Sequence, residues 1–286
     1  MTPLVFRSDY ARTSAGSAEL ERLIRDIFAV DVSPLDRLGH DPSVMAFGWW
    51  LENELVANVS LYERQLWLSG KKVAAFGVQS VAVRPEWRGR GLFRDLMTRV
   101  LDFADSRSRL VILVTGTPEL YAPFGFRKIG ETIFSGKVSR GALRPGSRRL
   151  SLNDDSDLAL LSDLFSRRTP TSYLASACDH PALFLLKAAG SPAIELRHLL
   201  DLDAVVAIQG LNSPCLTLLD VVAASMPSLQ EIIAALGHAG EQVEVRLTPD
   251  RLSWQTEAQT AVDNGYMVRG EFSPEDQAFM FSDMRI

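Results

Sequence analysis

The 286-residue sequence has two cysteines and no long apolar run, and each shortage excludes a class of protein. Cys178 and Cys215 cannot staple a chain of this length, so a disulfide framework is excluded. No apolar run approaches the roughly 20 residues that cross a bilayer. The first ten residues lack a basic start followed by an apolar core, so no signal peptide is predicted. We expect a cytoplasmic protein with no membrane partner.

The four histidines are also too few and too scattered to indicate a metal site. His40, His180, His198 and His238 show no metal-ligand spacing and no paired nucleophile. We therefore expect ordinary surface or core roles for them, and no metal cofactor.

The net charge of -5 is unevenly distributed. Residues 1–150 hold 22 basic and 16 acidic side chains, whereas residues 151–286 hold 8 and 19. A basic half suits nucleic acid, a membrane surface or a phosphorylated cofactor. A single small arginine cluster, without an extended basic surface and stacking aromatics, disfavours nucleic acid.

The first half is predicted to alternate strands and helices. Leu20, Ile24 and Phe28 recur at helical spacing, and so do Leu92 and Leu96. A strand, a crossover helix and an apolar strand over 73–114 make a βαβ unit. The expected helices are 17–28 and 91–104, and the expected strands are 4–7, 45–51, 55–62, 65–68, 73–83, 110–114 and a closing strand at 133–138.

The second half repeats this order more faintly, which favours an internal duplication. The stretch 139–149 holds two glycines, a proline and four arginines, and is the best linker candidate. We therefore expect domains at 1–142 and 150–286. The expected helices are 157–166 and 228–236, and the expected strands are 193–197, 205–209, 216–222 and 242–247.

The segment most informative about function is V-A-V-R-P-E-W-R-G-R-G-L-F-R-D-L, residues 81–96. A strand ends, a turn with Gly89 and Gly91 follows, and a helix begins. The first amides of a helix have no intrahelical partners and lie at the positive end of its dipole, which is a geometry that binds phosphate. Arg88, Arg90 and Arg94 add positive charge beside it.

This turn lacks the spacing of a dinucleotide fingerprint and the G-K-[ST] end of a nucleotide-triphosphate loop. It resembles the acyl-CoA motif [QR]-x-x-G-x-[GA] of the GNAT superfamily, the GCN5-related N-acetyltransferases. Arg88 takes the first place and Gly91 the fourth, while Phe93 departs from the small residue of the sixth. The bulky side chain fits if its ring turns into the core.

A second segment, T-G-T-P-E-L-Y-A-P-F-G-F at 115–126, resembles the Y-x-x-x-G-[FY] segment of the same superfamily. Tyr121 stands four residues before Gly125-Phe126. The resemblance implies an α/β GNAT fold with a mixed sheet, in tandem with a second, degenerate GNAT-like domain.

The run G-V-Q-S-V-A-V-R-P-E-W-R-G-R-G-L-F-R-D-L-M is similar to the Eis-type (enhanced intracellular survival) branch, where a large residue often replaces the second small residue of the turn. Such proteins carry a further C-terminal sterol-carrier-like domain that residues 1–286 do not include. Mycothiol-synthase-like tandem GNAT proteins are a neighbouring alternative.

The resemblance implies an N-acetyltransferase that uses acetyl-CoA as cosubstrate. Tyr121 is the candidate general acid for the departing thiolate. The general base is left open among Glu54, Glu63, Glu119 and the terminal carboxylate of Ile286, because Eis-type proteins are thought to use their chain terminus. The residues implied to bind the cofactor are Val81, Ala82, Val83, Arg88, Gly89, Arg90, Gly91, Leu92, Phe93 and Arg94.

The same residues also allow other roles and another function. The alternative for Tyr121 is a packed aromatic without a catalytic role. The alternative for Glu54 and Glu63 is that both are solvated strand residues. A non-catalytic CoA-binding sensor or scaffold is the competing function. The second half has V-A-A-S-M-P where an R-G-x-G turn would stand, so one site per chain is expected. The sequence implies a small-molecule or peptide amine as acceptor but does not specify which one. It allows a homo-oligomer but does not specify the oligomeric state.

Overall fold

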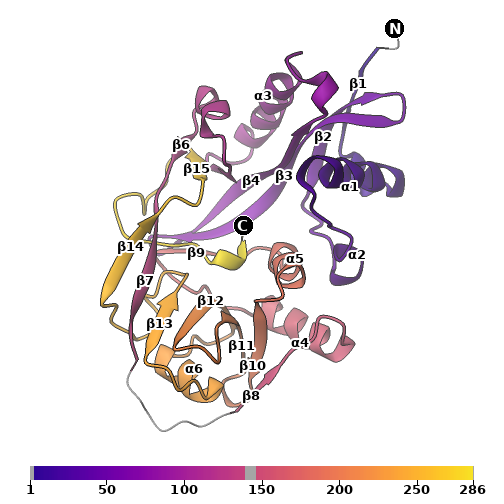
Figure 1. Cartoon of the computed structure of the whole chain (residues 1–286). Coiled ribbons are helices and arrows are strands. Elements are labelled where there is room, and N and C mark those ends of the chain that lie inside the picture. The colour runs from indigo at the N-terminus through magenta and orange to yellow at the C-terminus, as the bar shows by residue number, and fades with distance from the viewer. Residues whose placement is uncertain (1–2, 139–145, 286) are drawn as a thin grey trace. The chain divides into compact units, whose positions relative to one another are not determined.

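The computed structural model describes residues 3–138 and 146–285 (Figure 1). Among them no helix has both the length and the apolar character needed to cross a membrane. The chain forms two compact units whose segments alternate along the sequence. The first unit comprises residues 1–64, 74–129 and 265–271, and the second comprises residues 65–73, 130–264 and 272–286.

The sheet of the first unit has one parallel pair among antiparallel neighbours. β4 runs parallel to β5, and α3 makes the crossover between them. This is the predicted βαβ unit. In spatial order the strands are β1 (Val5–Ser8), β2 (Met45–Leu51), β3 (Glu54–Leu68), β4 (Lys71–Val83), β5 (Val111–Val114), β15 (Tyr266–Arg269) and β6 (Arg127–Lys128), and β9 (Ala175–Ala177) pairs with the far end of β3.

Two helices cover opposite faces of this sheet (Figure 1). α1 (Ser14–Phe28) begins at Thr13, whose hydroxyl accepts the Gly16 N–H, and it buries Leu20 and Leu23 against one face. α3 (Leu92–Asp105) buries Leu96, Met97, Val100 and Leu101 against the other face. Side chains alternate between the faces along each strand, so neighbouring residues of β3 and β4 belong to different cores.

The second unit contains a sheet with the same plan. β12 runs parallel to β13, and α6 (Leu229–Leu236) makes the crossover. In spatial order the strands are β8 (Ser147–Arg149), β10 (Glu195–Leu199), β11 (Ala204–Gln209), β12 (Cys215–Ala223), β13 (Gln242–Val245), β7 (Glu131–Lys137) and β14 (Ala258–Val262).

α6 packs on one face of this second sheet through Leu229, Ile232, Ile233 and Leu236, and α4 (Asp155–Ser166) lies along β11 and β12. The remaining helical segments are short. They are α2 (Leu35–Leu38), α4 (Asp155–Ser166), α5 (Ala182–Gly190) and the 3-10 turns η1 (Tyr10–Arg12), η2 (Pro85–Trp87), η3 (Pro118–Leu120), η4 (Ala122–Phe124), η5 (Leu200–Leu202) and η6 (Asp283–Arg285).

Each sheet contains one strand whose place in the chain order belongs with the other sheet. β7, expected to close the first sheet, pairs instead with β13 in the second, and β15 takes the matching place beside β5. The strand expected at 133–138 therefore exists, but its assignment to the first sheet was wrong. The shared order, with the parallel pair at the same place, supports the internal duplication. Strand pairing is long-range, so the sequence pattern could not reveal the exchange.

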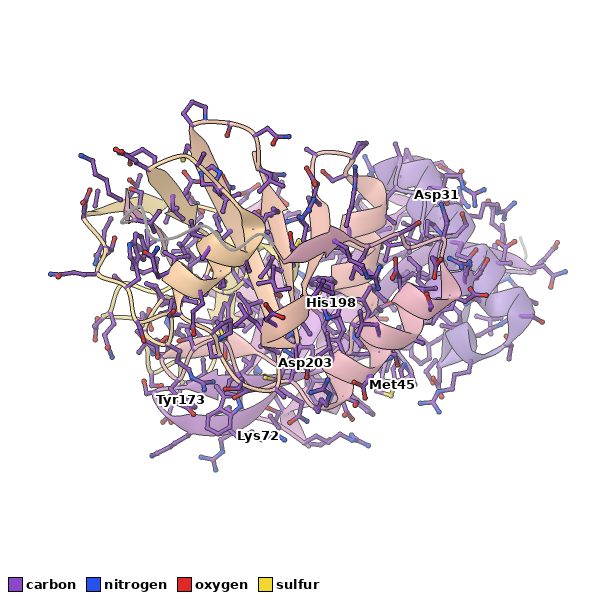
Figure 2. The ribbon with its side chains drawn as sticks, turned by 90° about the horizontal axis from the view of Figure 1, so that it is seen from below. Asp31, Met45, Lys72, Tyr173, His198 and Asp203 are labelled. Carbon is purple, nitrogen blue, oxygen red and sulfur yellow. The ribbon has the colours of Figure 1, made fainter. Side chains whose placement is uncertain are left out.

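Two further expectations are corrected. The strands predicted at 55–62 and 65–68 are one continuous strand, β3, because Glu63 and Arg64 continue the alternation without a turn. The end of the β3–β4 hairpin hydrogen-bonds to the segment at Tyr173 and Leu174, which explains why Lys72 and Tyr173 lie near each other in Figure 2. Part of the predicted linker is strand β8, and its residues 139–145 lie outside the described residues.

Candidate functional site

The predicted turn between β4 and α3 has the backbone conformation that its glycines allow. Gly89 and Gly91 have φ values of 75° and 80°, in the left-handed region. A Cβ built on either would meet no atom within 4 Å, so it is backbone conformation and not space that requires glycine. Gly91 is also the N-cap of α3 and offers no side chain to the helix. The first turn of α3 is therefore left uncapped by its N-cap residue.

Arginines surround this helix start. The Arg88 Nε–H donates to the Val83 carbonyl at 3.2 Å, and Arg90 Nη2 donates to the Glu86 carbonyl at 3.1 Å. The Arg90 guanidinium also stacks over the Trp87 ring, 4.5 Å from its centroid. Arg88, Arg90 and Arg94 are all exposed. Positive charge and helix amides thus lie together on the surface, as an anion-binding turn requires.

Beside the turn, β4 leaves its parallel neighbour. The register joins Phe76 with Val111 and Gly77 with Ile112 and ends there, although β4 continues to Val83. A strand edge that has left its neighbour suits a ligand that adds itself as a strand.

A one-residue bulge marks the place where β4 turns. Phe76 and Val78 face the α3 side, and so do Val81 and Val83, whereas Ala82 faces the α1 side. The spacing of three between Val78 and Val81 requires one extra residue in the strand. Ser80 supplies it, with φ of 53°.

Phe93 turns its ring inward, as expected for a bulky residue at this position of the turn. It packs edge-to-face on Tyr121, with ring centroids 5.6 Å apart, and on Phe124 at 5.7 Å. Such aromatic pairs stabilise beyond their buried area. The structure therefore brings the cofactor turn and the candidate acid Tyr121 together through one side chain.

Tyr121 is 7% exposed, and burial raises the pKa of its hydroxyl to about 12, although a hydrogen bond with Thr115 acts in the opposite direction. The hydroxyl is consequently protonated at neutral pH, which a proton donor requires.

The candidate bases are dispersed. Glu54 forms an ion pair with Arg84, with Oε1 3.2 Å from Nε, and Arg84 also pairs with Asp26 at 2.9 Å. Glu63 and Glu119 are exposed. Ile286 lies outside the described residues. The structure thus places Tyr121 beside the turn and singles out none of these carboxylates as the base.

The matching place in the second unit is closed. α6 begins with a capping box in which the Ser228 hydroxyl accepts the Glu231 N–H at 3.2 Å and the Glu231 carboxylate accepts the Ser228 N–H at 2.8 Å. These bonds use amides that an anion would need. Gly91 of the first unit provides no such cap.

The C-terminal segment adds a second obstacle in the same unit. Ser282 Oγ donates to the Leu219 carbonyl of β12 at 3.0 Å, and the Asp283 N–H donates to the Arg246 carbonyl that follows β13 at 3.2 Å. Phe281 and Met284 beside them are fully buried. The C-terminal segment therefore lies across the ends of the parallel pair β12–β13. No such segment is seen at the end of the corresponding pair β4–β5 among the described residues of the first unit.

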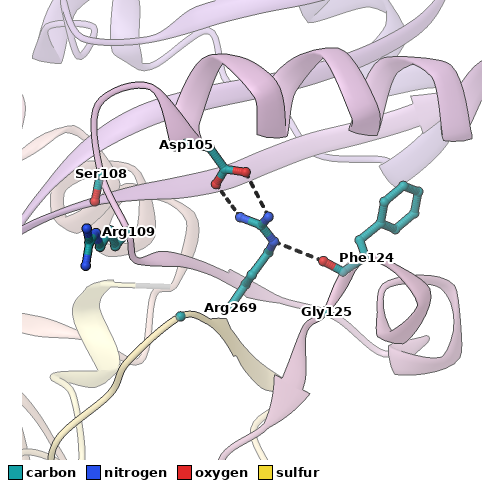
Figure 3. Close-up of a pocket in the computed structure, with 7 residues that line it drawn as sticks. Asp105, Ser108, Arg109, Phe124, Gly125 and Arg269 are labelled. Carbon is teal, nitrogen blue, oxygen red and sulfur yellow. Dashed lines mark hydrogen bonds and ion pairs between the residues drawn. The ribbon is translucent and has the colours of Figure 1, made fainter.

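A pocket of about 470 Å³ lies at the other end of α3 (Figure 3). None of the residues predicted for the site lines it. At its wall Arg269 bonds the Asp105 carboxylate and the Phe124 carbonyl. The lining residues are Asp105, Ser108, Arg109, Phe124, Gly125, Arg269 and Gly270.

One group of possible metal-ligating side chains was not foreseen. Ligand atoms of Glu21, Asp36 and His40 lie within 4.8 Å of one another, and His40 Nε2 is 3.0 Å from Asp36 Oδ1. The spacing of Asp36 and His40 was a readable signal, but Glu21 comes from α1 and joins only in three dimensions. His40 and Asp36 are exposed, as surface ion pairs are.

Comparison with known proteins agrees with this geometry. Residues 21–129 match the family model described as "Acetyltransferase (GNAT) domain". That match covers the second half of α1, the turn and the Tyr121 segment. No curated protein matches the chain.

Several solved structures share the fold at low identity. A GCN5-related N-acetyltransferase from Kribbella flavida is 20% identical, with 96% of this chain and 74% of that chain covered and a TM-score of 0.56. A probable N-acyltransferase from Enterococcus faecalis V583 is 15% identical, with 94% and 73% covered and a TM-score of 0.62. Eis1 from Mycobacterium abscessus is 16% identical, with 93% and 73% covered and a TM-score of 0.59.

These similarities cover more than nine-tenths of this chain, while the family match covers residues 21–129. The expected GNAT fold is therefore confirmed. Residues 21–129 thus match a GNAT acetyltransferase domain, and the fold is shared with Eis1 over 93% of this chain.

Proposed function

We propose that the chain is an acyl-CoA-dependent N-acyltransferase that moves an acetyl group from acetyl-CoA to a primary amine. The observation that carries the proposal is the start of α3, whose N-cap Gly91 offers no side chain, beside the opening between β4 and β5. The helix amides at Leu92, Phe93 and Arg94, with Arg88 and Arg90, would hold the diphosphate. The backbone of Val81, Ala82 and Val83 would pair with the pantetheine arm.

The reaction is written as a direct transfer. The neutral amine attacks the thioester carbon, an N–C bond forms, and a tetrahedral intermediate results. A backbone N–H beside the opening stabilises its oxygen. The C–S bond then breaks, the thiolate takes the proton of Tyr121, and the nitrogen that attacked gives up its extra proton, which restores the Tyr121 hydroxyl. A free alkylamine resembles lysine, with a pKa near 10.4, so a base must accept its proton first. Glu54, Glu63, Glu119 and the carboxylate of Ile286 stay the candidates.

The catalytic role is assigned to the first domain, expected at 1–142, and a non-CoA role to the second, expected at 150–286. The capping box of Ser228 and Glu231 supports this division, because it uses the amides of the only other parallel-pair crossover helix among the described residues.

Calorimetric titration with acetyl-CoA tests the first part of the proposal. Wild-type chain should bind, and the Arg88→Ala/Arg90→Ala variant should bind more weakly, because two cations beside the diphosphate are removed. Absence of binding at millimolar acetyl-CoA would reject both the enzyme and the sensor.

A screen of amines with a thiol-reactive dye then tests turnover. Candidate acceptors are polyamines, amino acids, peptide N-termini and protein lysines. Cys215 is an exposed free cysteine, so the Cys215→Ser chain removes a background that the dye would otherwise report. Binding without thiol release for every acceptor class would favour the non-catalytic sensor.

A further inference from the structure

A buried polar group lies on the α1 face of the first sheet, where its neighbours are apolar. Asn58 of β3 is 0% exposed, as is Ser60. The Tyr10 hydroxyl donates to Asn58 Oδ1. Asn58 Nδ2 donates to the Ser80 carbonyl at 2.6 Å and to Ser60 Oγ at 3.0 Å. Burying an amide is costly unless each atom is hydrogen-bonded, so this group is tightly specified.

The direction of the Asn58 amide follows from its partners. A backbone carbonyl only accepts, so the atom facing the Ser80 oxygen must be the amide nitrogen. The opposite atom is then the oxygen, which accepts the Tyr10 proton. Burial raises the pKa of the Tyr10 hydroxyl and keeps it protonated as a donor. Asn58 Nδ2 thus holds the Ser80 carbonyl, and the Tyr10 hydroxyl satisfies the opposite atom of the amide.

The Ser80 carbonyl belongs to the bulge of β4. Its residue has φ of 53°, a conformation that costs a serine about 1–2 kcal/mol. Something must hold the backbone there. The 2.6 Å bond from Asn58 is the contact that does so from a buried, rigid strand.

The bond also sets the direction of the next N–H group. Ala57 and Val59 face the core that contains Tyr121, so by alternation Asn58 faces the other side, with Tyr10. The Ser80 carbonyl therefore points toward the Tyr10 face. In a planar trans peptide the carbonyl and the following N–H point in opposite directions. The Val81 N–H is consequently turned toward the face that carries Tyr121.

We infer that Asn58 is a positioning residue for acyl transfer, which holds the Ser80–Val81 peptide so that the Val81 N–H polarises the thioester carbonyl. The inference rests on the proposed function and adds a residue to it, the side chain that holds the β4 bulge from the neighbouring strand. Asn58 acts through the backbone and does not touch the substrate.

Infrared difference spectroscopy of bound acetyl-CoA carrying ¹³C at the thioester carbonyl tests the inference without an amine acceptor. A hydrogen bond to the carbonyl lowers its stretching frequency. In Asn58→Ala the band should move to higher frequency than in wild type. Turnover with the best acceptor should fall about 10- to 100-fold, somewhat less than for loss of an oxyanion donor. The affinity for CoA itself, which lacks the carbonyl, should stay close to wild type.

Tyr10→Phe is the matched control. It removes one hydrogen bond from the same buried group but leaves the Asn58 amide on the Ser80 carbonyl. Its carbonyl band and turnover should stay near wild type. A purely structural role for Asn58 would lower the melting temperature in both variants and shift the band in neither.

A second variant covers the case in which Asn58→Ala folds poorly. Tyr10→Phe/Asn58→Leu replaces both partners of the Tyr10–Asn58 bond by apolar groups of similar shape, so it should cost less stability than Asn58→Ala, although the Ser80 carbonyl still loses its partner. The band should shift here as well. An unshifted band with unchanged turnover in either Asn58 variant overturns the inference alone. Wild-type chain that does not bind acetyl-CoA overturns the proposed function and the inference with it.

Discussion

Arg269 and Asp105, 164 residues apart in sequence, form a two-pronged ion pair at the end of α3 (Figure 3). Both Nη atoms of Arg269 donate to the carboxylate, one of them at 2.8 Å, and Nε donates to the Phe124 carbonyl at 3.0 Å. Phe124 packs on Phe93, which packs on Tyr121. A residue of the exchanged strand β15 thereby ties the Tyr121 segment to α3.

Replacing Arg269 with lysine should lower the stability of the chain. Lysine keeps the charge but cannot bond the carboxylate and the carbonyl at once, so we expect a loss of about 1 kcal/mol for this partly exposed pair. Urea denaturation measures the change. Arg22→Lys, in the exposed i, i+3 pair with Glu19, is the control and should cost less. Equal effects of the two substitutions would show that the bond to Phe124 contributes nothing.

Gly91→Ala should weaken acetyl-CoA binding and reduce stability by about 1–2 kcal/mol, because alanine at φ of 80° is strained. Calorimetry and thermal unfolding report the two effects. Gly116→Ala is the matched control, since a Cβ there meets nothing within 4 Å and its φ lies outside the left-handed region. If Gly91→Ala bound acetyl-CoA as wild type does, the turn would not be the diphosphate site.

The stoichiometry of acetyl-CoA binding should be one per chain. The amides at the start of α6 are used by Ser228 and Glu231, and the C-terminal segment hydrogen-bonds across the ends of β12 and β13. Isothermal titration gives the number directly. Two sites per chain, or one site that survives Arg88→Ala/Arg90→Ala unchanged, would contradict the assignment to the first unit.

Tyr121→Phe should lower kcat about 100-fold and leave the acetyl-CoA affinity nearly unchanged, as expected for loss of a general acid. Because the pKa of Tyr121 is about 12, its ionisation should not reduce the wild-type rate below about pH 11. A pH–rate profile checks this. A variant as fast as wild type at every pH would remove Tyr121 from the reaction.

Glu131 should make stability depend on pH. The carboxyl is 1% exposed, and burial raises its pKa from 4.5 to about 7, against hydrogen bonds from Asn264 and the Phe281 N–H. The folded state then binds more protons than the unfolded state between those values. The contribution is therefore fully present below pH 4.5 and is lost as pH rises through 7, by about 3 kcal/mol in total.

Denaturation at several pH values, with and without Glu131→Gln, measures this slope. The glutamine cannot ionise, so its curve should be flatter over the same range. Glu257→Gln, at an exposed position, is the control and should keep the wild-type slope. Parallel curves for wild type and Glu131→Gln would assign the pH dependence elsewhere.

Much of the local structure could be read from the sequence. Helical spacing located α1 and α3, and the R-G-x-G turn after V-x-V-x-P located the start of α3 at Leu92. The bulge was also readable, since Phe76 and Val78 alternate and the pattern slips by one before Val81 and Val83. The inward ring of Phe93 followed from its size at the turn. Each of these features depends on neighbours within a few residues, which periodicity and backbone preference record.

The sequence by itself determined the fold class, the turn and the strand–helix–strand order around it. Only the tertiary structure decided which strands pair, because register and partner depend on contacts between distant segments. In the tertiary structure β7 pairs within the second sheet, Arg269 of β15 forms an ion pair with Asp105, and the Tyr10 hydroxyl donates to Asn58. The two interactions involving Arg269 and Asn58 join segments that no local pattern connects, and they hold the backbone on either side of the proposed site.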